Sequence, residues 1–65
     1  MTLEQEEWLR REVTQLVGET DGFSDACLYV RNVVDDAFGE RGWRITEEQV
    51  LAELRRQFFG EPGRG

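Results

Sequence analysis

Apolar residues recur along the chain in three stretches that have the 3.6-residue spacing of amphipathic helices. The central stretch, residues 25–38, spreads its apolar positions over about half of a helix circumference. They are Ala26, Cys27, Tyr29, Val30, Val33, Val34, Ala37 and Phe38. A helix that covers one side of a core needs an apolar arc of only a little over ~100°. The central stretch therefore predicts a helix that contacts two neighbours.

The two flanking stretches have narrower apolar stripes and would supply those neighbours. The first stripe consists of Leu9, Val13, Leu16 and Val17. The last consists of Val50, Leu51, Leu54 and Phe58. Each stripe fits one face of a helix, so all three stretches can share one core.

Both flanking helices begin with the same capping pattern. Thr2 stands three residues before Gln5, and Thr46 stands three residues before Gln49. In a capping box the hydroxyl of the first residue accepts from the later amide, and the glutamine side chain reaches back. The pattern predicts helix starts at residues 3 and 47.

The central helix is predicted to start with Ser24 as its N-cap. Phe23 and Leu28 would then form a hydrophobic staple across that cap. Gly18, Gly39 and Gly60 are predicted to end the three helices, because glycine is favoured just beyond a helix C-terminus.

The expected fold is an all-α, compact three-helix bundle with short loops. Its helices span about residues 3–17, 25–38 and 47–59. Between the last two, Trp43 and Ile45 are two positions apart, so a short extended segment would turn both toward the core. We expect residues 1–60 to form a single helical domain and residues 61–65 to form a flexible tail.

The composition excludes several kinds of chemistry. Fourteen acidic residues against eight basic ones give a net charge of −6, and all eight basic residues are arginine. Without lysine there is no Schiff-base chemistry, and without histidine the commonest general base is missing. Cys27 is the only cysteine, and we expect it to be a small buried hydrophobe. We predict no enzyme activity, cofactor, metal site or small-molecule substrate.

The chain begins without a secretory signal pattern and contains no apolar run of the ~20 residues that a transmembrane helix needs. We therefore expect a cytoplasmic protein that has no contact with membranes.

Aromatic residues are abundant for so short a chain. There are seven, and Phe58 and Phe59 are adjacent, so they cannot both face one way on a helix. We expect at least one aromatic to stay on the surface of a monomer, where such side chains form interface hot spots. Trp8, Trp43 and Phe59 are the candidate partner-binding residues. The leading hypothesis is protein–protein association, for which a homodimer is one form.

An alternative hypothesis rests on the acidic residues around the central helix. Asp25, Asp35, Asp36 and Glu40 would form an acidic face. Such a row of carboxylates could imitate nucleic-acid phosphates and inhibit a nuclease or polymerase through charge complementarity.

A second alternative is a small regulator that binds DNA in the manner of a helix-turn-helix protein. Its basic patch would consist of Arg41, Arg44, Arg55 and Arg56. The last helix, however, opens with Glu47 and Glu48, which would face the phosphates. The net negative charge also makes nucleic acid an unfavoured partner.

Overall fold

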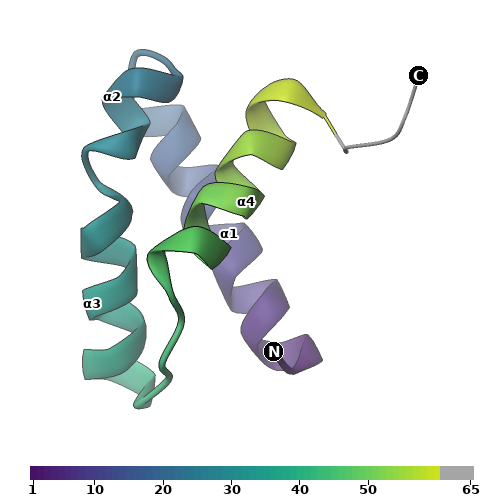
Figure 1. The fold of residues 1–65 in the computed structure, drawn as a ribbon, viewed down its shortest axis with the longest axis vertical. Coiled ribbons are helices and arrows are strands. Elements are labelled where there is room, and N and C mark those ends of the chain that lie inside the picture. The colour runs from purple at the N-terminus through teal and green to yellow at the C-terminus, as the bar shows by residue number, and fades with distance from the viewer. Residues whose placement is uncertain (61–65) are drawn as a thin grey trace.

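The structure is a computed structural model that describes residues 1–60. Four helices and no strands occur in this part of the chain (Figure 1). They are α1 (Leu3–Glu19), α2 (Phe23–Cys27), α3 (Val30–Arg41) and α4 (Glu47–Phe59). The prediction of an all-α helical bundle is confirmed. The predicted tail, residues 61–65, lies outside the described residues.

The capping patterns start α1 and α4 as predicted. The Thr2 hydroxyl accepts from the Gln5 amide at 3.2 Å, and the Thr2 amide donates to the Gln5 side chain at 2.9 Å. Thr46 and Gln49 form the same pair of bonds, at 3.1 and 2.9 Å. Each box satisfies two backbone groups that a bare helix end would leave unpaired.

The predicted central helix is interrupted. Tight turns replace it at Leu28 and Tyr29, whose amides donate to the carbonyls of Asp25 and Ala26 at 3.1 and 3.0 Å. The interruption separates α2 from α3, and Ala26 and Val30 on its two sides are both buried.

The predicted start of the central helix is also wrong. α2 begins at Phe23 after Gly22, which has φ 139°, and no side chain caps it. Ser24 is therefore inside the helix and is not its cap. Leu28 is 75% exposed, so it cannot form the predicted staple with Phe23.

Helix ends match the predicted glycines in one case of three. Gly60, with φ 88°, follows α4 as expected. α1 continues through Gly18 to Glu19, and α3 continues through Gly39 to Arg41. α3 ends instead at Gly42, whose φ of 71° is accessible to glycine at little cost.

The core lies where α4 crosses the other helices, and α4 packs against α1, α2 and α3 (Figure 1). Its most completely enclosed large side chains are Val13, Val50 and Leu54. The remaining buried apolar residues are Trp8, Leu9, Ala26, Val30, Val33, Ala37 and Ile45. No polar or charged residue within 1–60 is buried.

The connection from α3 to α4, residues 42–46, is irregular and not a strand. Ile45 is buried and Trp43 is half-buried against the core, so the expectation that both turn inward is confirmed. The segment returns along the bundle from the end of α3 to the start of α4 (Figure 1). This path leaves a hollow beside α3.

Candidate functional site

The hollow beside α3 has a volume of about 520 Å³. Its apolar lining consists of Val34, Phe38, Trp43 and Ile45. Its charged lining consists of Arg31, Asp35, Arg44 and Glu47. We call this set of eight residues the α3 groove. It is formed by one face of α3, the 42–46 segment and the start of α4.

Phe38 is the most prominent apolar side chain of the α3 groove. It is 57% exposed, although it lies on the same helix as the buried Val33 and Ala37. The Arg44 guanidinium carbon lies 5.9 Å from the centre of its ring. Apart from that cation–π contact, the ring is open to a partner, because more than half of its surface faces solvent.

Trp43 joins the α3 groove to the core. Its ring meets that of Trp8 edge to face, with 5.8 Å between centroids, and the Arg41 guanidinium lies 5.3 Å from its ring centre. The left-handed Gly42 directs the chain so that the Trp43 amide donates to the Ala37 carbonyl at 3.1 Å. Trp43 is thereby held in place while part of its ring remains accessible.

Trp8 itself is 4% exposed and belongs to the core. Trp8 therefore offers almost no surface to a partner in the folded chain. The helix wheel put Trp8 away from the main apolar stripe of α1. The sequence pattern could not show that the irregular 42–46 segment brings Trp43 across to cover it.

Arg31 joins the two sides of the α3 groove. One of its terminal nitrogens lies 3.2 Å from Glu47 Oε2, and its Nε lies 3.6 Å from Asp35 Oδ1. These groups are well exposed, so each pair contributes little to stability. Within residues 1–60, Arg44 makes no ion pair.

Phe59 lies in a second aromatic group at the other end of α4. Its ring is 5.2 Å from that of Phe23 and 6.2 Å from that of Phe58, while Phe23 and Phe58 meet edge to face at 5.8 Å. Phe23 and Phe58 are half-buried, and Phe59 is 71% exposed. The expectation that at least one of the aromatics stays on the surface is confirmed. Phe59 and Trp43 nevertheless belong to different surfaces.

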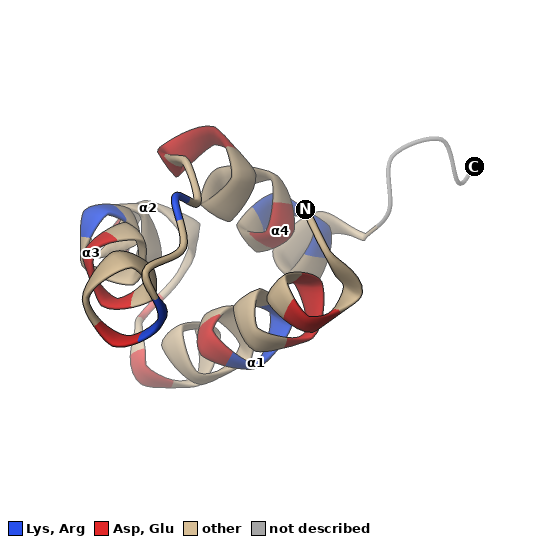
Figure 2. Cartoon of the chain, turned by 90° about the horizontal axis from the view of Figure 1, so that it is seen from below, with Lys and Arg blue, Asp and Glu red and all other residues tan. Residues whose placement is uncertain are grey.

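The four predicted acidic-face residues do not share one environment. Asp35 pairs with Arg31, and Asp25 accepts from the Asp21 amide at 3.1 Å in the loop before α2. Asp36 and Glu40 instead lie close enough to Glu12 of α1 that their repulsion raises the pKa of Glu12. Both acidic and basic residues occur on each of α1, α3 and α4 (Figure 2).

Carboxylates gather in a second hollow, of about 240 Å³, between α1 and α3. Glu12, Glu19 and Asp36 line it. Partial burial raises the pKa of Glu12, and repulsion from Glu40 and Asp36 adds to that rise, against a lowering by Arg11. Glu12 was not among the residues predicted to form a site. The feature of the sequence that could have indicated it is the position of Glu12 beside the apolar stripe of α1.

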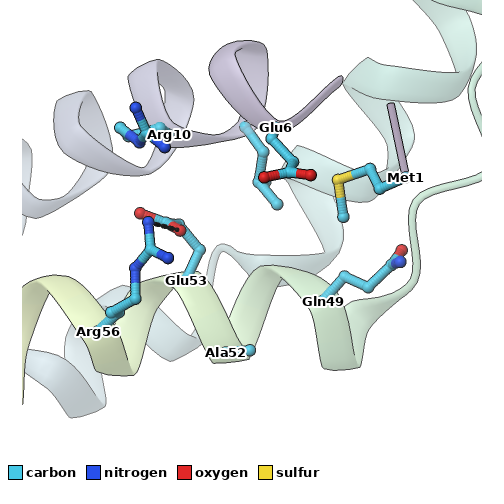
Figure 3. A pocket seen from close by; sticks show the side chains of 8 residues that line it. Met1, Glu6, Arg10, Gln49, Ala52, Glu53 and Arg56 are labelled. Atoms are coloured by element: carbon cyan, nitrogen blue, oxygen red, sulfur yellow. Dashed lines mark ion pairs between the residues drawn. The ribbon is translucent and has the colours of Figure 1, made fainter. Parts of the chain in front are cut away.

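A third hollow, of about 220 Å³, lies between α1 and α4 (Figure 3). Glu6 and Arg10 approach it from α1, and Glu53 and Arg56 from α4 (Figure 3). Glu53 and Arg56 form an ion pair at 3.0 Å, and Glu53 also accepts from Gln57. Glu53 and Arg56 thus satisfy each other's charge, whereas Glu6 and Arg10 form no ion pair within residues 1–60.

The arginines expected to form a basic patch are mostly engaged within the chain. Arg41 pairs with Glu4 at 3.9 Å, Arg44 lies over Phe38, and Arg56 pairs with Glu53. The described residues also contain no cluster of three or more potential metal ligands. Among the helices of residues 1–60, none has the length and apolar content required to cross a membrane.

Comparison of the chain with models of protein families, with curated proteins and with solved structures finds no match. The geometry of the chain itself is therefore the basis for any proposal about its function.

Proposed function

We propose that this chain is a helical protein-association module and that the α3 groove is its contact surface. The observation that carries the proposal is the exposed Phe38 ring beside a hollow whose floor is apolar. An accessible aromatic side chain next to an apolar hollow, with charges at its edge, is the usual composition of an interface hot spot.

The α3 groove is a better candidate than the Phe59 group because it combines a projection with a cavity. The Phe59 ring contacts its own neighbours Phe23 and Phe58. At the α3 groove, Val34 and Trp43 are only half-buried, so a partner can complete their burial. Burial of apolar area is the main favourable term in protein association.

Inhibition by nucleic-acid mimicry has weaker support than association through the α3 groove. Its four candidate carboxylates are divided among different surroundings, and Asp35 is already paired with Arg31. DNA binding has weaker support for a related reason. α4 begins with Glu47 and Glu48, and three of the four candidate arginines contact acidic or aromatic side chains of the same chain.

The proposal includes a cytoplasmic location and assigns no catalytic role. A cytoplasmic location agrees with a chain whose single cysteine has no partner.

The proposal can be tested by site-specific photo-cross-linking in living cells. A photoreactive phenylalanine analogue at position 38 should give a discrete protein adduct, and the same analogue at position 28, where the native side chain is even more exposed, should not. The captured protein is then purified and titrated against the wild-type chain and against Val34→Glu.

Saturable binding that Val34→Glu abolishes without loss of helicity would support the proposal. Equal labelling from positions 28 and 38, or binding that is indifferent to Val34→Glu, would refute it.

A further inference from the structure

We infer that the occupant of the α3 groove is a second copy of this chain, bound across a two-fold axis. The inference rests on the proposed function and names the partner. It follows from the shape and the charge of the α3 groove.

The shape of the α3 groove suits contact with a second copy. In a two-fold interface the same patch occurs on both sides, so a projection on one copy must find its cavity within the same patch of the other. The α3 groove meets this condition, because the exposed Phe38 ring borders the hollow over Val34 and Trp43. Two copies can each place Phe38 toward the hollow of the other.

The charges of the α3 groove also suit contact with a second copy. Two molecules with a net charge of −6 repel each other over most of their surfaces. The α3 groove carries two arginines and two carboxylates, so its own charges cancel. Contact between copies is therefore less opposed at this face than at the acidic hollow lined by Glu12, Glu19 and Asp36.

Arg44 gives the α3 groove a positive charge that a second copy can pair. Within residues 1–60 it has no carboxylate partner, whereas Asp35 and Glu47 share Arg31. A two-fold axis through the α3 groove brings each Arg44 toward the carboxylates of the other copy. Each Arg44 then forms the ion pair that it lacks in a single chain. The two-fold symmetry gives two such ion pairs in the dimer.

The experiment is sedimentation equilibrium of the full chain from micromolar to millimolar concentration. We expect the apparent mass to rise from 7.6 kDa toward twice that value. Phe38→Glu should weaken the dimer by about 30-fold or more, the factor that corresponds to a hot-spot side chain. Phe59→Glu is the control, because it makes the same charge change at an even more exposed phenylalanine outside the α3 groove.

A second pair of variants avoids apolar positions. Arg44→Glu and Arg55→Glu both reverse one exposed arginine and take the net charge from −6 to −8. Arg44→Glu should weaken the dimer several-fold more than Arg55→Glu. Equal effects would overturn the inference, because they would show that only net charge matters. Circular dichroism establishes that each variant keeps its helices.

The outcomes also separate this inference from the proposed function. If the wild-type chain stays monomeric at millimolar concentration, the inference that a second copy occupies the α3 groove is refuted. The proposed function then survives only if the position-38 adduct contains a different protein whose binding Val34→Glu abolishes. A dimer that survives Phe38→Glu overturns the choice of the α3 groove as the interface.

Discussion

Leu54→Ala is the most direct test of the core around α4. Leu54 has no exposed surface, and α4 is the helix that packs against the other three. Truncation of a buried leucine to alanine removes apolar contacts and leaves a cavity, at a cost of about 2–5 kcal/mol. Alanine is the best helix former, so the loss cannot be assigned to helix propensity.

The cost is large relative to the stability available to a small domain. At about 0.05–0.15 kcal/mol per residue, a chain of 65 residues has an unfolding free energy of about 3–10 kcal/mol. Each kcal/mol shifts the melting temperature of a domain of this size by about 4–8 °C. Leu54→Ala should therefore lower the melting temperature by at least about 8 °C.

The assay is thermal and urea unfolding followed by circular dichroism. Leu28→Ala is the matched control, because it makes the same substitution at a leucine that is 75% exposed. We expect it to change the unfolding free energy by about 0.5 kcal/mol or less. If Leu54→Ala cost no more than Leu28→Ala, the described core would be wrong.

Three further predictions concern turns, caps and charge. Gly42→Ala should destabilise the fold by about 1 kcal/mol or more, because the backbone there has a φ of 71°. Gly39→Ala should stabilise the fold by about 0.5–1 kcal/mol, because Gly39 lies inside α3 and a Cβ there meets no other atom within 4 Å. Urea unfolding should show changes of opposite sign in the free energy of unfolding for the two variants. Thr46→Ala should cost about 1 kcal/mol through loss of the α4 cap, and Thr46→Ser should retain most of that stability. Glu12→Gln should raise the melting temperature at neutral pH, because the raised pKa means that the folded chain disfavours the Glu12 carboxylate. Protonated Glu12 stabilises the fold below its ordinary pKa of 4.5, and this stability is lost as the pH rises through the higher pKa of the folded chain. The Glu12→Gln variant should therefore lose its advantage over the wild-type chain in acid.

Local patterns in the sequence were sufficient for much of the fold. The capping boxes at Thr2 and Thr46 depend on residues three positions apart, and both helix starts were predicted correctly. The stripe positions Val13, Val50 and Leu54 are all fully buried. Such features can be predicted because their determinants lie within one or two helical turns.

Features that depend on tertiary packing could not be predicted in this way. The break at Leu28 and Tyr29 separates α2 from α3, and nothing in the local sequence pattern requires it. Trp8 was expected near the surface because the covering Trp43 comes from an irregular segment far away in the sequence. Phe38 lay at one edge of the predicted apolar arc, and its ring is 57% exposed although Val33 and Ala37 of the same helix are buried.

The position of α4 in the chain has a consequence for how the protein is made. During synthesis α1, α2 and α3 leave the ribosome before α4. The faces that α4 covers are exposed to solvent until α4 emerges. A nascent chain that ends before residue 47 therefore lacks the segment that would let it reach the native state. Stable structure should therefore form only after α4 has left the ribosome.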